Sequence, residues 1–190
     1  WRWAVAPRLA PEGGAGPGVG GILGVVRDGA AASRGRLVAA RDLMWHRGPD
    51  DAGEWTSSEA CLGARRLSII DLSSASHQPM VSDDGLTVLC YNGEIYNFVE
   101  LRQDLAALGV TFRGRGDTEV LLKAYEQWGI EALNRLNGMW AFVLWDGRKR
   151  KLVASRDRFG VKPLYYTVVE GAWIFASEIK ALLAYPGALK

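Results

Sequence analysis

Two neighbouring residues, Asn92 and Gly93, could stabilise negative charge on a reacting oxygen. Hydrolysis of a carboxamide passes through a tetrahedral oxyanion, which needs preorganised donors such as the Asn92 side-chain amide and the Gly93 backbone N–H. Glycine at position 93 would also let the backbone come close to a ligand. A purely structural interpretation stands beside this one, because Asn-Gly after a strand is a turn signal.

Two charged residues could hold the ends of an amino acid. Arg66 lies at the end of an expected strand, and a guanidinium group suits bidentate binding of an α-carboxylate. Asp117 could pair with an α-ammonium group. The alternatives are a surface arginine and a plain helix N-cap. Together with the two donors for an amide oxygen, these residues describe a site for glutamine.

The elements that must position these residues follow from the apolar pattern. A short buried strand is expected over 22–26, and helical spacing predicts a helix over 36–45 that ends before Gly48 and Pro49. Further strands are expected over 54–56, 61–67, 86–91, 139–145, 151–156, 164–169 and 173–176. Further helices are expected over 97–108, 117–128, 130–136 and 177–183, with N-caps at Asn97, Asp117 and Ser177.

The order of these elements favours an α+β fold. Strands, then helices, then strands again do not suit a doubly wound parallel sheet, which needs regular alternation. Two mostly antiparallel sheets packed face to face, with helices outside, fit better. Residues 1–19 are rich in Ala, Pro and Gly and are expected to form a flexible leader, and residues 20–190 one domain.

Composition excludes several classes of protein. A net charge of +2 gives no argument for a nucleic-acid or membrane partner, and the longest apolar stretches are strand-sized. Cys61 and Cys90 are expected to be small core residues in a reducing, cytoplasmic compartment, with a catalytic thiol or a disulfide as alternatives. No cysteine and histidine cluster indicates a metal site.

A set of motifs occurs in one order along the sequence and is jointly specific. It resembles the class II glutamine amidotransferase domain, and within that class the glutamine-hydrolysing asparagine synthetases. The resemblance covers the sequence from Gly20 to about Leu183. The motifs are His-Arg-Gly-Pro-Asp (46–50), Arg-Leu-Ser-Ile-Ile-Asp (66–71), Asn-Gly-Glu-Ile-Tyr-Asn (92–97), Gly-Asp-Thr-Glu (116–119), Arg-Asp-Arg-Phe-Gly-Val-Lys-Pro-Leu-Tyr-Tyr (156–166) and Phe-Ala-Ser-Glu-Ile-Lys-Ala-Leu (175–182).

The resemblance implies an N-terminal-nucleophile hydrolase-like fold, a four-layer α/β/β/α sandwich, in agreement with the element order. It also implies that Arg66 holds the glutamine carboxylate and Asp117 the ammonium group. Asn92 and Gly93 would form the oxyanion hole. The remaining pocket residues would be Glu94, Ile69 and Ile70.

One position departs from this family, whose domain begins Cys-Gly-Ile with the cysteine as nucleophile. This sequence reads Gly20-Gly21-Ile22, and nineteen residues precede Gly20. In such hydrolases the free α-amino group serves as base for the thiol of the same residue. Gly20 has no thiol, and its nitrogen lies in a peptide bond if residues 1–19 remain, so glutamine hydrolysis is expected to be lost. Cys90 is the alternative nucleophile, but it has no neighbouring α-amine to act as its base.

The resemblance also implies partners. L-glutamine is the expected ligand, and the C-terminal synthetase domain of the same protein is the expected partner. Residues 46–50 would form a structural turn near the pocket, and residues 156–166 a buried segment toward that domain. ATP and Mg²⁺ are expected only in the synthetase domain, whose Ser-Gly-Gly-x-Asp-Ser loop does not occur here. The sequence leaves open whether the protein forms a homodimer. The two hypotheses are a glutaminase domain with its nucleophile replaced, and a pseudo-glutaminase domain that supports an ATP-dependent amide-forming partner.

Overall fold

The computed structural model describes residues 20–26, 34–66, 77–185 and 188. The expected leader over 1–19 and the expected pocket residues Ile69 and Ile70 lie outside the described residues.

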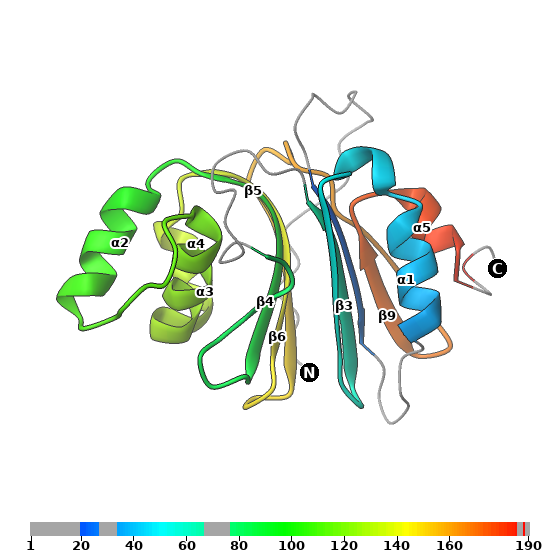
Figure 1. Ribbon diagram of the computed structural model, residues 1–190, viewed down its shortest axis with the longest axis horizontal. Helices are drawn as coiled ribbons and strands as arrows, with labels where there is room; N and C mark the ends of the chain where they lie inside the picture. The colour runs from blue at the N-terminus through cyan, green and yellow to red at the C-terminus, as the bar shows by residue number, and fades with distance from the viewer. Residues whose placement is uncertain (1–19, 27–33, 67–76, 186–187, 189–190) are drawn as a thin grey trace.

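Two antiparallel sheets form the centre of the molecule (Figure 1). Neighbouring strands pair in the antiparallel sense throughout both sheets. The five-stranded sheet has the order β2-β3-β1-β9-β8, with β2 Asp51–Thr56, β3 Ala60–Arg66, β1 Gly21–Val26, β9 Ala172–Ala176 and β8 Tyr165–Val169. The four-stranded sheet has the order β4-β5-β6-β7, with β4 Met80–Val81, β5 Thr87–Ile95, β6 Gly138–Asp146 and β7 Lys151–Arg156.

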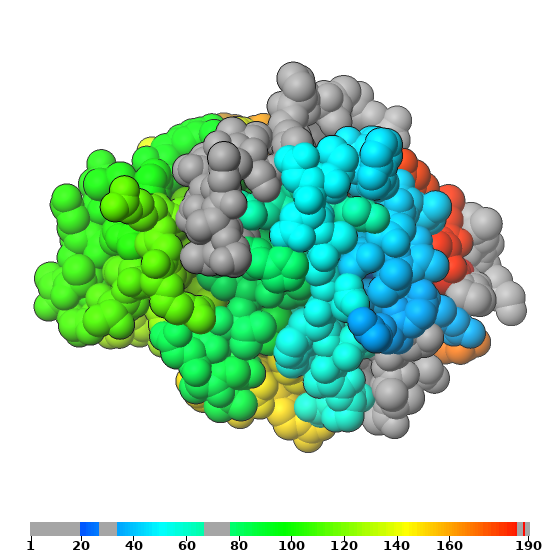
Figure 2. Space-filling model, in the orientation of Figure 1, coloured from blue at the N-terminus to red at the C-terminus, as the bar shows by residue number. Residues whose placement is uncertain are grey.

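Helices cover the outer face of each sheet, which confirms the expected α/β/β/α layering (Figure 1). The space-filling view shows α2 and α3 at one end of the molecule and α1 and α5 at the other (Figure 2). The five-stranded sheet carries α1 Arg34–Asp42 and α5 Ile179–Leu183, with the short 3₁₀ turn η1 Trp45–Arg47. The four-stranded sheet carries α2 Phe98–Ala107, α3 Asp117–Trp128 and α4 Ala132–Arg135, with the 3₁₀ turn η3 Gly129–Glu131.

Strand alternation divides the apolar residues among three cores. In β5, Leu89 and Tyr91 face the helices, whereas Val88 and Cys90 face the other sheet. Cys61 belongs to the third core, between the five-stranded sheet and its helices. Both cysteines are buried, as expected of small core residues.

The two sheets are in close contact where β1 crosses β6. A Cβ atom on Gly24 would lie 2.8 Å from Cγ1 of Val143 and 3.1 Å from Cδ2 of Leu62. Only glycine fits there without displacing a neighbour, since interiors are close-packed. The contact fixes the first strand over the centre of the four-stranded sheet.

Two expectations about local structure are wrong. The expected strand over 86–91 does not end in a turn, because β5 continues through Asn92 and Gly93, which pair with Ala141 and Trp140 of β6. The Asn97 side chain does not cap α2: it donates from Nδ2 to the Arg135 carbonyl and accepts from the Asn137 N–H. Long-range pairing thus replaces both local signals.

The other two expected N-caps also bind elsewhere. Asp117 is the first residue of α3, with Gly116 as its cap, and its carboxylate reaches β5. Ser177 precedes α5, but its hydroxyl accepts a hydrogen bond from the Ile22 N–H at 3.1 Å. Both side chains link separate elements of the fold rather than capping a helix.

Among the described residues, no helix is long and apolar enough to cross a bilayer.

We predict that Gly24→Ala destabilises the domain by about 1–3 kcal/mol, the usual cost of overpacking a core. Gly63→Ala on the neighbouring β3 is the matched control, because a Cβ there would meet only ordinary contacts, the nearest at 3.5 Å. Urea unfolding of both variants measures the difference. Equal stability of Gly24→Ala and the parent would contradict the close approach of β1 and β6.

Candidate functional site

The expected site residues that lie on described strands are found at one edge of the two sheets. Asn92 of β5 pairs with Ala141 of β6, which in turn pairs with Arg156, the last residue of β7. The chain then crosses to the five-stranded sheet, where β8 begins. At the same edge β1 begins and β3 ends (Figure 1). This edge therefore joins residues that are far apart in the sequence.

Gly20 lies immediately before β1 and is half-buried. Its carbonyl accepts a hydrogen bond from Nε of Arg47 at 3.3 Å. A Cβ atom added at Gly20 would lie 2.8 Å from the backbone oxygen of Arg65. The backbone as it stands therefore leaves no room for a side chain at this position.

Arg47 is a site residue that the sequence analysis left within a structural turn. Its side chain is buried, and Nη1 forms an ion pair with Glu178 at 3.0 Å. Glu178 also pairs with His46 and Lys180. Burial opposes the charged form of Glu178, yet hydrogen bonds from Lys180, Arg47 and His46 lower its pKa. Nη2 of Arg47 is buried and has no hydrogen-bond partner among the described residues.

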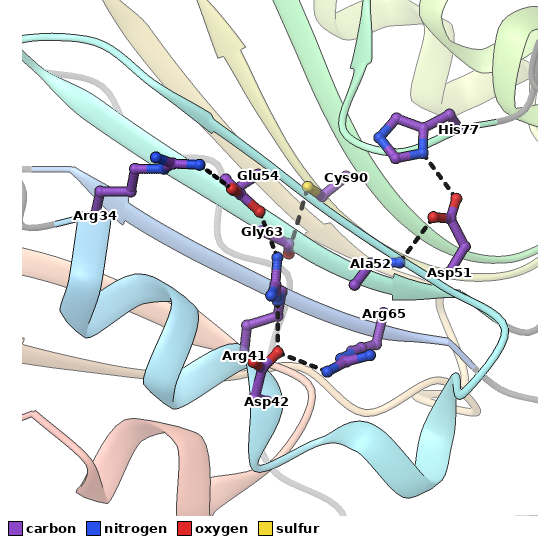
Figure 3. A network of polar contacts seen from close by, with 10 residues as sticks. All are labelled: Arg34, Arg41, Asp42, Asp51, Ala52, Glu54, Gly63, Arg65, His77 and Cys90. Atoms are coloured by element: carbon purple, nitrogen blue, oxygen red, sulfur yellow. Dashed lines mark hydrogen bonds and ion pairs between the residues drawn. The ribbon is translucent and has the colours of Figure 1, made fainter.

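Arg66 occupies the last position of β3, and its direction follows from its neighbour. Arg65 forms an ion pair with Asp42 of α1 at 2.7 Å, so its side chain lies on the helix-covered face (Figure 3). Successive residues of a strand point to opposite faces. Arg66 therefore belongs to the face that looks toward the four-stranded sheet, as a glutamine ligand would require.

Asn92 and Gly93 show different constraints within β5. Asn92 is 4% exposed, and its Nδ2 has no hydrogen-bond partner among the described residues. A buried amide donor without a partner costs free energy, which an oxyanion or amide oxygen would recover. A Cβ at Gly93 would lie 2.3 Å from the Met139 carbonyl oxygen and 2.8 Å from Cα of Trp140. The neighbouring strand thus already requires glycine at position 93.

Asp117 is buried and joins α3 to β5. One carboxylate oxygen accepts hydrogen bonds from the Tyr91 hydroxyl at 2.7 Å and from the Ile95 N–H at 3.1 Å. Burial, with the nearby Asp117 charge, raises the pKa of Tyr91, so its phenol stays protonated and donates. Asp117 therefore supports the fold whether or not it also binds an ammonium group.

Glu94 lies at the same end of β5, half-buried, beside a residue that the sequence analysis did not single out. Lys162 is 6% exposed, and its ammonium lies within electrostatic range of Glu94, Arg47 and Asp157. Burial lowers the pKa of Lys162, and the attraction of Glu94 opposes this effect. The motif Gly-Val-Lys-Pro, which contains Lys162, is the feature of the sequence that could have pointed to this residue.

The segment over 156–166, expected to be buried toward a partner domain, is only partly buried within this chain. Asp157 and Lys162 are buried, but Phe159 is 87% exposed and Val161 57% exposed. The backbone of this crossover closes on the Asp157 carboxylate, which accepts hydrogen bonds from several N–H groups. The donors are Trp140, Phe159, Val161 and Lys162.

The arrangement offers donors and charges but no evident nucleophile among the described residues. Sγ of Cys90 lies 3.6 Å from the Gly63 carbonyl oxygen, inside the core between the sheets (Figure 3). Burial raises the pKa of the Cys90 thiol, which keeps it uncharged and unreactive. Within the described ranges no cluster of His, Cys, Asp and Glu residues could hold a metal ion.

Comparison with solved structures gives the same architecture. The glutamine phosphoribosylpyrophosphate amidotransferase of B. subtilis, solved with ADP and GMP, matches 86% of this chain and 43% of its own with a TM-score of 0.68 at 22% identity. An allosteric regulatory enzyme of purine biosynthesis matches the same shares with a TM-score of 0.75 at 21% identity. These likenesses establish a fold shared with amidotransferases.

Sequence comparison gives the family. A glutamine-hydrolyzing asparagine synthetase 1 of Bacillus subtilis (strain 168) is 46% identical over 141 residues, 74% of this chain and 22% of that protein. A putative glutamine-hydrolyzing asparagine synthetase of Mycobacterium tuberculosis (strain ATCC 25618 / H37Rv) is 43% identical over 184 residues, 92% of this chain and 26% of that protein. The chain thus spans about a quarter of the length of these relatives. A family model for the glutamine amidotransferase domain matches residues 19–190, so the chain belongs to this family and is related to the glutamine-hydrolysing asparagine synthetases.

Proposed function

We propose that this domain binds L-glutamine as a glutaminase domain does but does not hydrolyse it. The observation that carries the proposal is Gly20, which stands beside Arg47 at the edge where the ligand-holding residues gather and offers no side chain. Binding and attack depend on different groups, so one can be retained while the other is lost.

Three features support a retained pocket. Arg66 belongs to the face between the sheets, and Asn92 keeps a buried amide donor free of partners among the described residues. Glu94 lies half-buried at the end of the same strand as Asn92. Together they offer a cation, a neutral donor and an anion, which complement the carboxylate, amide oxygen and ammonium group of glutamine.

The loss of hydrolysis follows from chemistry. An N-terminal-nucleophile hydrolase needs a side-chain nucleophile and a free amine on the same residue. Gly20 lacks the first, and with residues 1–19 in place its nitrogen is an amide and lacks the second. Cys90 is held in the core between the sheets and cannot replace them.

In the longer relatives this domain is one part of an asparagine synthetase. We propose that the partner here is likewise an ATP-dependent synthetase domain of the same protein, which takes its ammonia from solution. The second candidate is a pseudo-glutaminase domain that supports such a partner without binding glutamine. The contacts that Asp117 makes with Tyr91 and Ile95 favour it, because they give that residue a role in the fold.

We predict that the chain releases no glutamate from glutamine. The measurement is a glutamate assay over several hours with purified protein, with heat-killed protein as the blank. Glutamate above the blank would contradict the loss of hydrolysis. The Cys90→Ala variant would then test whether Cys90 is the source.

We predict that Gly20→Cys alone restores no glutaminase activity. The new thiol would have no free amine, and its Cβ would collide with the Arg65 carbonyl oxygen unless the backbone shifts. Removal of residues 1–19, so that the new cysteine is the first residue, should restore turnover. Equal activity with and without residues 1–19 would show that the amine is not the base.

We predict that Arg66→Ala weakens glutamine binding by about tenfold or more, since a lost charge-assisted hydrogen bond costs about 1.5–3 kcal/mol. Calorimetric titration with L-glutamine measures the change. Arg36→Ala, an exposed arginine of α1, is the matched control. Asp117→Ala is a poorer test, because it also removes the acceptor of two buried hydrogen bonds. A folded parent without detectable glutamine binding would favour the second candidate.

A further inference from the structure

Two of the sequence motifs, 46–50 and 175–182, are given no role by the proposed function, yet they meet in the structure. One carboxylate oxygen of Glu178, in the second motif, lies 2.9 Å from Nε2 of His46 and accepts a hydrogen bond from Nη1 of Arg47 at 3.0 Å. The other oxygen lies 3.0 Å from Nζ of Lys180. Three basic side chains therefore share one acidic partner.

Arg47 is the buried member of this group. Its side chain is 5% exposed, whereas the side chains of His46 and Lys180 are 51% and 48% exposed. Nη2 of Arg47 is buried and has no hydrogen-bond partner within the described part of the chain. A buried donor without a partner costs free energy, so an attraction elsewhere must hold the guanidinium in place. The ion pair with Glu178 supplies such an attraction.

Arg47 connects Glu178 to the start of β1. Its Nε donates to the Gly20 carbonyl at 3.3 Å. The residue before Glu178 holds the same stretch of chain directly. The Ile22 N–H donates to the Ser177 hydroxyl at 3.1 Å, and the Ser177 N–H donates to the Ile22 carbonyl at 3.0 Å. Two consecutive residues thus fix the start of β1, Ser177 by direct contact and Glu178 through Arg47.

We propose that Glu178 is a positioning residue, which holds Arg47 against the Gly20 carbonyl and so fixes the edge of the pocket at the position of the family's nucleophile. The role needs the charge of Glu178, because an uncharged side chain would leave Arg47 and Lys180 without their shared anion. The contact with Gly20 is made to its backbone, so it needs no side chain at position 20. Only the effect on glutamine binding rests on the proposed function.

NMR of the full chain tests this role without a ligand. In a ¹⁵N-arginine-labelled chain, the Nε–Hε signal of Arg47 reports how firmly the guanidinium is held, because a buried, hydrogen-bonded N–H exchanges slowly with water. Glu178→Gln keeps the shape of the side chain but not its charge, and should speed this exchange by about tenfold or more. Glu59→Gln is the matched control, since Glu59 also pairs with an arginine, Arg150, but lies before the other end of β3. It should leave the Arg47 signal unchanged.

The Nε–Hε signal of Arg41 separates positioning from a general loss of stability. Arg41 of α1 is also buried, and its Nε donates to Asp42 at 2.8 Å. Glu178→Gln should leave its exchange unchanged. Equal acceleration at Arg41 and Arg47, or no acceleration at Arg47, would overturn the positioning role.

Calorimetric titration with L-glutamine distinguishes failure of this inference from failure of the proposed function. Glu178→Gln should weaken binding by about threefold or more, because it loosens one edge of the pocket. Binding that Glu178→Gln leaves unchanged would overturn the claim that the held position belongs to the pocket. A folded parent that binds no glutamine, with faster Arg47 exchange in Glu178→Gln, would reject the proposed function and keep the hold on Gly20.

Discussion

The close contact of β1 with β6 is the constraint on which the site depends. Because Gly24 has no side chain, the first strand lies directly against Val143, and the two sheets share one apolar core. The start of β1 is thereby brought to the edge where β5 ends and where the chain crosses from β7 to β8. The candidate site is a consequence of sheet packing, with residues supplied by segments far apart in the sequence.

The order of the elements was enough to predict the layers. Apolar runs were enough to predict most of the strands, because the continuous runs in β5 and β6 match strands that are buried on both faces. Local signals failed where long-range partners compete for the same groups. Asn92-Gly93 has the sequence of a turn but pairs with β6. Asp117 and Ser177 have the sequence of helix caps but bind Ile95 and Ile22. No local pattern could predict those partners.

The candidate site residues stay predictions, and sequence motifs pointed to some of them more clearly than to others. Arg66, Asn92 and Glu94 stand in motifs, and the structure brings their strands to one edge. Lys162 also stands in a motif, but its burial depends on the crossover between the sheets. Sequence alone gave no reason to prefer it over the exposed Phe159 in the same segment.

The proposed function separates two properties that a glutaminase combines, since it assigns to this domain the groups that hold glutamine but not the group that attacks it. One NMR experiment addresses both, because saturation-transfer difference reports binding while the glutamine side-chain signals report hydrolysis over time. We predict saturation transfer to glutamine with no conversion to glutamate in the same tube. Conversion to glutamate, or a folded chain that transfers no saturation to glutamine, would contradict this account.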